Sequence, residues 1–221
     1  LADASSASQN VAVGREALKQ TTTAQNLVAV GYQALYANTT ANNNIAIGAY
    51  AADANTTGSE NVAIGKEALT DNTTGSENVA IGYDALGNNT TASNNTAVGY
   101  QALQANTTGQ RLVAVGRDAL KANTTGAYNT AVGMYALDAN TIGEQNTALG
   151  YNSATNITEG DYNTALGSNS LSDCTTGVTN VAIGRSALRF VTTANDCTAV
   201  GAFALNNNTA TGNTAFGSDA L

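Results

Sequence analysis

Tyrosine, arginine and lysine residues recur along the chain at separations that are multiples of seventeen positions. Their side chains offer flat aromatic faces and cationic groups, which suit contact with sugars and with protein surfaces. The members of this series are Arg15, Tyr32, Lys66, Tyr83, Tyr100, Arg117, Tyr151 and Arg185. We expect them to form one contact ridge on the surface. Acidic residues such as Glu16 follow several of them, so the simpler interpretation is a solvated row of neighbouring charges or a packing contact between chains.

The two cysteines, Cys174 and Cys197, also carry reactive side chains. Their separation is one repeat plus six positions, so they do not stack on each other. A disulfide bond between them requires that their two positions meet, either within one chain or between chains. Such a bond would suit an extracellular setting, whereas two buried free thiols are the alternative, and the sequence leaves both open.

Catalytic chemistry has little support in the sequence. The chain has no histidine, so neither a histidine-based triad nor a histidine-ligated metal site can form. The carboxylates are scattered, and they never recur as a close pair of the kind that acid–base catalysis uses. We therefore expect no enzyme activity, no catalytic or metal-binding residues and no cofactor.

The regular spacing comes from a repeat that covers the whole chain. The sequence Asn-Val-Ala-Ile-Gly occurs at 61–65, 78–82 and 180–184, and its glycine recurs at every seventeenth position until a last, shorter step. The thirteen glycines are Gly14, Gly31, Gly48, Gly65, Gly82, Gly99, Gly116, Gly133, Gly150, Gly167, Gly184, Gly201 and Gly217. A fixed short period predicts a stack of similar turns, here called rungs, in one continuous array over residues 1–221.

Positions within a rung are numbered from its glycine as zero, and residues that share a position form a column. Position −2 is always Ala, position −1 is bulky and apolar, and position −3 is Val, Ile or Thr. We predict a five-residue strand that ends at the glycine, with β-branched residues on one face and Asn, Ala and Gly on the other. The invariant Ala and Gly indicate close approach of another backbone. If the chain is a trimer, we expect this face to form the contact between chains.

The rest of each rung is less strongly determined. Positions +3 and +4 are mostly Ala and Leu, and we predict a second short extended segment because so short a repeat leaves little room for a helix. Asn-Thr-Thr-Gly then supplies a turn whose Asn and Thr side chains can hydrogen-bond along their columns, with Thr always at position +8. The same Asn residues match glycosylation sequons, which we interpret simply as the turn column. They are Asn38, Asn55, Asn72, Asn89, Asn106 and Asn123.

Charge and hydropathy limit the partners. A net charge of −8 argues against nucleic acid, which needs clustered Lys and Arg, and suits a soluble, acidic surface. No apolar run approaches the roughly 20 residues of a membrane span, so we expect no membrane insertion. Leu1 and Leu221 both fall in the leucine column, and neither end resembles a polar cap, so we expect a section of a longer chain.

Repeats of the form Asn-x-Ala-Ile-Gly resemble the head repeats of trimeric autotransporter adhesins, the YadA-like heads. The longer unit at 95–103, followed by Asn-Thr-Thr-Gly at 106–109, is similar to repeats in phage tail-fibre proteins. Together with the period, the resemblance implies an all-β chain that forms a parallel β-solenoid or β-roll of thirteen 17-residue rungs. It further implies a left-handed coil and a homotrimer of chains side by side.

The function implied by this resemblance is that of a structural or adhesive fibre segment. It would be the shaft or head of a phage tail fibre or surface adhesin, spacing or presenting a receptor-binding tip for host attachment. The expected location is extracellular, on a virion tail fibre or a cell surface. The expected partners are copies of the chain itself and a cell-surface glycan or protein receptor. The alternative is an ice- or surface-binding solenoid that uses its Thr column.

Overall fold

The structure is a computed structural model that describes residues 6–221. Leu1, the first member of the predicted leucine column, lies outside the described residues. Residues 6–221 form an all-β, parallel β-solenoid of thirteen strands without a helix, which confirms the predicted all-β parallel solenoid. The chain divides into two compact units, the first ending at Arg111 and the second beginning at Leu112.

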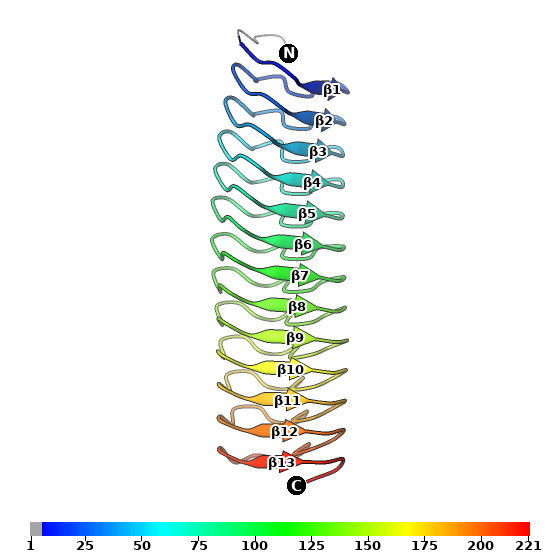
Figure 1. The fold of residues 1–221 in the computed structure, drawn as a ribbon, viewed down its shortest axis with the longest axis vertical. Helices are drawn as coiled ribbons and strands as arrows, with labels where there is room; N and C mark the ends of the chain where they lie inside the picture. The colour runs from blue at the N-terminus through cyan, green and yellow to red at the C-terminus, as the bar shows by residue number, and fades with distance from the viewer. Residues whose placement is uncertain (1–5) are drawn as a thin grey trace. The chain divides into compact units, whose positions relative to one another are not determined.

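Each unit is a stack of parallel strands that follow one another in sequence order (Figure 1). The strands of the first unit are β1 (Val11–Val13), β2 (Val28–Val30), β3 (Ile45–Ile47), β4 (Val62–Ile64), β5 (Val79–Ile81) and β6 (Thr96–Val98). Those of the second are β7 (Val113–Val115), β8 (Thr130–Val132), β9 (Thr147–Leu149), β10 (Thr164–Leu166), β11 (Val181–Ile183), β12 (Thr198–Val200) and β13 (Thr214–Phe216). Neighbouring strands pair in register, so that Ala63 lies beside Ala80.

The strands have three residues where we predicted five. They end at position −1 because the following glycine takes a left-handed φ, which is 136° at Gly65. They begin after position −4 because the Asn there bonds through its side chain, as when the backbone N–H of Asn78 donates to Oδ1 of Asn61 over 3.0 Å. The strand is therefore limited at both ends by the two polar or flexible residues that flank it.

The two faces of each strand are the reverse of what burial of bulky residues would suggest. Ala63 at position −2 is fully buried, whereas Ile47 at position −1 is 40% exposed. The narrow interior is filled by Ala at −2 and +3, Leu at +4 and two Asn columns, which leaves the branched side chains outside. The prediction that the Ala and Gly face forms a contact between chains is therefore wrong, because that face packs inside its own chain.

Positions +1 to +4 form a turn, so the predicted second extended segment is also wrong. Positions +2 and +4 have left-handed φ values, 61° at Glu67 and 55° at Leu69. This conformation directs the N–H groups of positions +2 and +4 to opposite neighbouring rungs. The N–H of Glu67 donates to Ala49 O in the preceding rung at 3.0 Å, and that of Leu69 donates to Ala85 O in the next at 2.9 Å. The turn thus keeps the rung-to-rung hydrogen bonding of a strand without its extended shape.

Asparagine and threonine side chains bond along their columns, as predicted. Nδ2 of Asn72, at position +7, donates to Oδ1 of Asn55 at 2.8 Å and to the carbonyl of Gly75 at 2.9 Å. The Thr73 hydroxyl donates to the carbonyl of Thr90 at 3.0 Å. The sequon asparagines from Asn38 to Asn123 are fully buried, which supports their interpretation as a structural column.

The glycine at position 0 is required by the close stacking of rungs. A Cβ atom at Gly65 would lie 2.3 Å from the carbonyl oxygen of Gly82, closer than atoms can approach. We expect Gly65→Ala to lower the free energy of unfolding by more than about 3 kcal/mol, since it adds this clash to a strained φ. Gly217 is the control, because its φ is 121° but no atom lies within 4 Å of the place a Cβ would take. Gly217→Ala should cost only about 1–2 kcal/mol in chemical denaturation, and equal losses would contradict the stacking argument.

The asparagine column offers a second, internal comparison. Asn72 both donates to Asn55 and accepts from Asn89, whereas Oδ1 of Asn140 has no hydrogen-bond partner because Ile157 follows it in the column. We expect Asn72→Ala to cost about 1–2 kcal/mol more than Asn140→Ala, since it removes one more buried hydrogen bond. Chemical denaturation, with each variant assigned to the unfolding transition of its own unit, measures the difference. Similar costs would show that the column contributes no bonding of its own.

Candidate interaction surfaces

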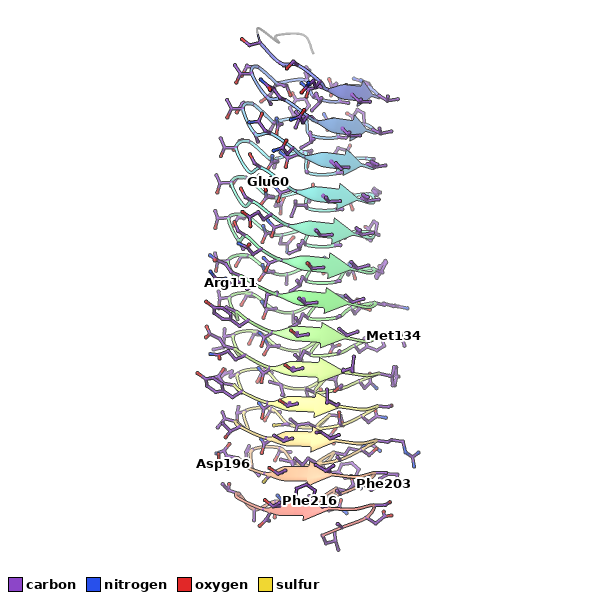
Figure 2. All side chains as sticks on the ribbon, viewed as in Figure 1. Glu60, Arg111, Met134, Asp196, Phe203 and Phe216 are labelled. Atoms are coloured by element: carbon purple, nitrogen blue, oxygen red, sulfur yellow. The ribbon has the colours of Figure 1, made fainter. Side chains whose placement is uncertain are left out.

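The outer strand face, defined as positions −3 and −1 of every rung, is the main apolar surface of each unit. Several of its members are more than a third exposed. In the first unit these are Val11, Val13, Ile45, Ile47 and Ile81, and in the second they are Val113, Val115, Leu149 and Phe216. Figure 2 labels Phe216 on this face of β13. Large exposed apolar patches are typical of surfaces that contact another molecule, so this face is the first candidate for such a contact.

All eight residues of the predicted ridge lie at position +1, directly after the glycine. In the first unit they contact one another: the Tyr83 and Tyr100 rings stack with centroids 5.4 Å apart, and Nζ of Lys66 lies 5.6 Å from the Tyr83 centroid. Arg15 lies 5.8 Å from the Tyr32 centroid. The structure therefore brings these ridge residues together from successive rungs.

In the second unit the ridge residues contact aromatic rings at position +2, as the Tyr32 ring also does in the first unit with Tyr50 at 5.2 Å. Arg117 lies 5.9 Å from the Tyr135 centroid, and the Tyr151 ring packs against the same Tyr135 at 6.3 Å. Arg185 lies 4.5 Å from the Phe203 centroid. These position +2 rings were not singled out from the sequence. They are irregularly placed within their column, so the adjacency of the two columns was the only signal that could have found them.

Two of the four basic residues on the ridge pair with acidic neighbours. Lys66 bonds Glu67 at 3.1 Å, and Arg117 bonds Asp118 at 3.0 Å. A hydrogen bond to Glu67 raises the pKa of Tyr83, because the carboxylate stabilises the protonated phenol. This pairing agrees with a solvated row of charges, and contact with a sugar or protein stays a prediction for the ridge.

Two half-buried carboxyl groups occupy position +5, one in each unit, and were not singled out from the sequence. Burial raises the pKa of Asp53 and of Asp138. Each accepts a hydrogen bond of 2.7 Å from a threonine hydroxyl one rung on, Thr70 or Thr155. Within residues 6–221, no three His, Cys, Asp or Glu side chains gather closely enough to hold a metal ion. That range also contains no helix with the length and apolar character needed to cross a membrane.

Cys174 and Cys197 are both buried free thiols in the structure. Their columns, +7 and −4, do meet inside the rung, since Nδ2 of Asn44 lies 3.4 Å from Oδ1 of Asn38. Cys197 already has polar partners, accepting from Nδ2 of Asn208 at 3.3 Å. Burial raises the pKa of the Cys174 thiol to about 11. A disulfide between the two cysteines stays a prediction for oxidising conditions.

These surfaces and the register of the strands define the chain as a repeat protein with a parallel β-solenoid fold. No family model, curated protein or solved structure matches it. Its function is therefore inferred from the geometry of its own columns.

The raised pKa of Cys174 predicts a pH dependence of stability. The unfolded thiol ionises near 9.0 and the folded one near 11, so the folded state holds the extra proton between these values. The stabilisation is fully present below about pH 9 and is lost as the pH rises through about 11, by at most about 3 kcal/mol. The wild-type and Cys174→Ala free energies of unfolding, measured from pH 8 to 11, should converge over this window. Parallel profiles would contradict the burial of this thiol.

Proposed function

We propose that the chain is a structural and adhesive segment of a fibre, the shaft or head of a phage tail fibre or surface adhesin. In this role it spaces or presents a receptor-binding tip. The observation that carries the proposal is the outer strand face, where Val, Ile, Leu and Thr stack in register on every strand of each unit. The resemblance of the Asn-x-Ala-Ile-Gly repeats to adhesin heads and tail fibres supports the same role.

The outer strand face suits association of identical chains. Ile47 and its neighbours at position −1 are already more than half buried, so covering the remainder yields on the order of 1 kcal/mol per residue. Summed over the strands of a unit, this is enough to hold chains together. We propose a homotrimer in which the outer strand faces of three chains meet around one axis, a closed arrangement that leaves no copy of the face exposed. We include in this proposal that the β-solenoid is left-handed.

The extracellular location, on a virion tail fibre or a cell surface, follows from this role, as does a glycan or protein receptor. The alternative role, ice or surface binding, has weaker support at the Thr column. The Thr39 hydroxyl at position +8 donates to the carbonyl of Thr56 at 3.1 Å, so this hydroxyl is engaged within the chain. Exposed threonines such as Thr57 and Thr74 follow at position +9 and form a single narrow row. Thermal hysteresis in a solution of the protein would favour this alternative.

The trimer is tested by the molar mass in solution, from light scattering coupled to size exclusion. We expect three times 22.2 kDa for the wild-type chain. Ile47→Lys combined with Ile64→Lys should give a folded 22.2 kDa species, because charges would then face one another across the outer strand faces. Tyr100→Lys, which places the same charge on the ridge, is the matched control and should leave the mass unchanged. A wild-type monomer would overturn the proposed assembly.

A further inference from the structure

Position +12, two residues before each of the strands β2 to β12, changes its chemistry between the units. In the first unit this column holds Asn26, Asn43, Glu60, Glu77, Asn94 and Arg111, and in the second it holds Tyr128, Gln145, Tyr162, Thr179 and Asp196. Tyr128 is 49% exposed and Tyr162 is 54% exposed. Their φ values are 61° and 58°, a left-handed conformation that asparagine adopts far more readily than tyrosine. The backbone conformation therefore does not favour tyrosine at these two positions. We look for the role of Tyr128 and Tyr162 in their exposed side chains.

The position +12 column runs along an edge of the second unit that is separate from the ridge. Figure 2 shows Asp196, a member of the column, at one edge of this unit and Phe203, whose ring packs with the ridge, at the opposite edge. The outer strand face lies between the two edges. A ligand bound to the position +12 column would therefore not cover the outer strand face, so it would not compete with the proposed contact between chains.

The side chains near the two tyrosines combine polar and apolar groups. Tyr128 and Tyr162 are two rungs apart, a separation of about 10 Å at the usual strand spacing. Gln145 lies in the rung between them, and its Nε2 donates to the Tyr162 hydroxyl oxygen at 3.2 Å. This bond leaves the Tyr162 O–H as a donor. Ile142, 50% exposed at position +9 of the same middle rung, adds an apolar contact. These four residues are called the tyrosine edge.

Within the second unit, the charge around the tyrosine edge is negative. Glu144, Glu159 and Asp161 lie in the same turns, and none of the residues 125–128, 142–145 and 159–162 is basic. Carboxylates can accept hydrogen bonds from sugar hydroxyl groups, but they repel acidic ligands. The surroundings thus favour a neutral ligand rich in hydroxyl groups over a uronate, a sialic acid or a phosphate.

We propose that the tyrosine edge binds a neutral, extended polysaccharide that runs along the rungs of the second unit. The apolar faces of two sugar rings would pack on the Tyr128 and Tyr162 rings, whose two-rung spacing is close to the repeat of two residues in an extended β-linked chain. Sugar hydroxyls between them would bond Gln145 and the Tyr162 O–H. This inference deepens the proposed adhesive function, because it names the receptor class and the residues that contact it.

The first test is the dependence of affinity on ligand length, measured by calorimetry on the full chain. The probes are cellohexaose and chitohexaose, the corresponding disaccharides, and polygalacturonate as the acidic comparison. A hexasaccharide spans both tyrosines and a disaccharide only one, so at least one hexasaccharide should bind ten times or more tighter than its disaccharide. Polygalacturonate should not bind. Failure of both hexasaccharides to bind, equal affinity for the two lengths, or preference for the acidic polymer would each overturn the proposal.

The second test uses variants of the tyrosine edge. Tyr128→Ala and Tyr162→Ala should each weaken hexasaccharide binding about tenfold, as expected for an aromatic anchor. Tyr162→Phe keeps the ring and should lose less. Tyr36→Ala, which removes a partly exposed tyrosine outside both the ridge and the tyrosine edge, is the control and should bind as the wild type does. Unchanged affinity in the two tyrosine-edge alanine variants, or an equal loss in Tyr36→Ala, would overturn the site.

The molar mass of each sample separates this inference from the proposed fibre assembly. A monomer that binds hexasaccharide would support sugar binding at the tyrosine edge and overturn the proposed trimer. A trimer that does not bind hexasaccharide would support the trimer and overturn sugar binding at the tyrosine edge. Unfolding midpoints show whether the alanine variants remain folded. Should they unfold, the Tyr162→Phe variant and the length dependence decide the outcome.

Discussion

The close approach of one backbone to the next at position 0 is the constraint on which the rest of each rung depends. A carbonyl oxygen of the following rung occupies the space of a side chain at Gly65, so only glycine fits there. This contact fixes the register, and the register puts every side chain directly over its equivalent in the neighbouring rung. Asparagine can then bond to asparagine, alanine can pack on alanine, and tyrosine can stack on tyrosine. The repetition of the same residue types at the same positions follows from this close contact between the backbones of neighbouring rungs.

The narrow cross-section that follows also decides which side chains face outward. An interior that holds Ala63, Leu69 and two asparagine columns has no room for a branched residue at position −1. The apolar groups that would form the core of an ordinary domain are therefore displayed on the surface. Inside the chain, ladders of hydrogen bonds act together with the buried Ala and Leu columns, and the branched side chains remain exposed for the proposed contact between chains. This division connects the fold to the proposed assembly.

The repeat in the sequence predicted which residues stack on one another. It did not predict which way their side chains point or which backbone conformation they adopt. The parallel stack, the columns of Asn72 and Thr73, and the alignment of the ridge at Tyr83 and Tyr100 all follow from the 17-residue period. The inward direction of Ala63 does not, because alternation along a strand is the same whichever face is buried. The left-handed φ of Leu69 was also hidden, since leucine rarely adopts it and only the stacked neighbours make it favourable. Periodicity thus reports which residues are equivalent, and the fold decides where they point.

The interruption of the asparagine column in the second unit bears on the fidelity of folding. Ile157, Cys174 and Val191, all buried, replace asparagine in three successive rungs. In a perfect repeat, a chain that pairs one rung out of place would make nearly the same contacts as the correct one, so misaligned states would compete with it. An apolar block within a polar column removes that degeneracy, because a shift would place Ile157 beside amides that it cannot bond. The apolar block therefore distinguishes rungs that would otherwise be interchangeable. Its local cost is the buried Oδ1 of Asn140, which has no hydrogen-bond partner.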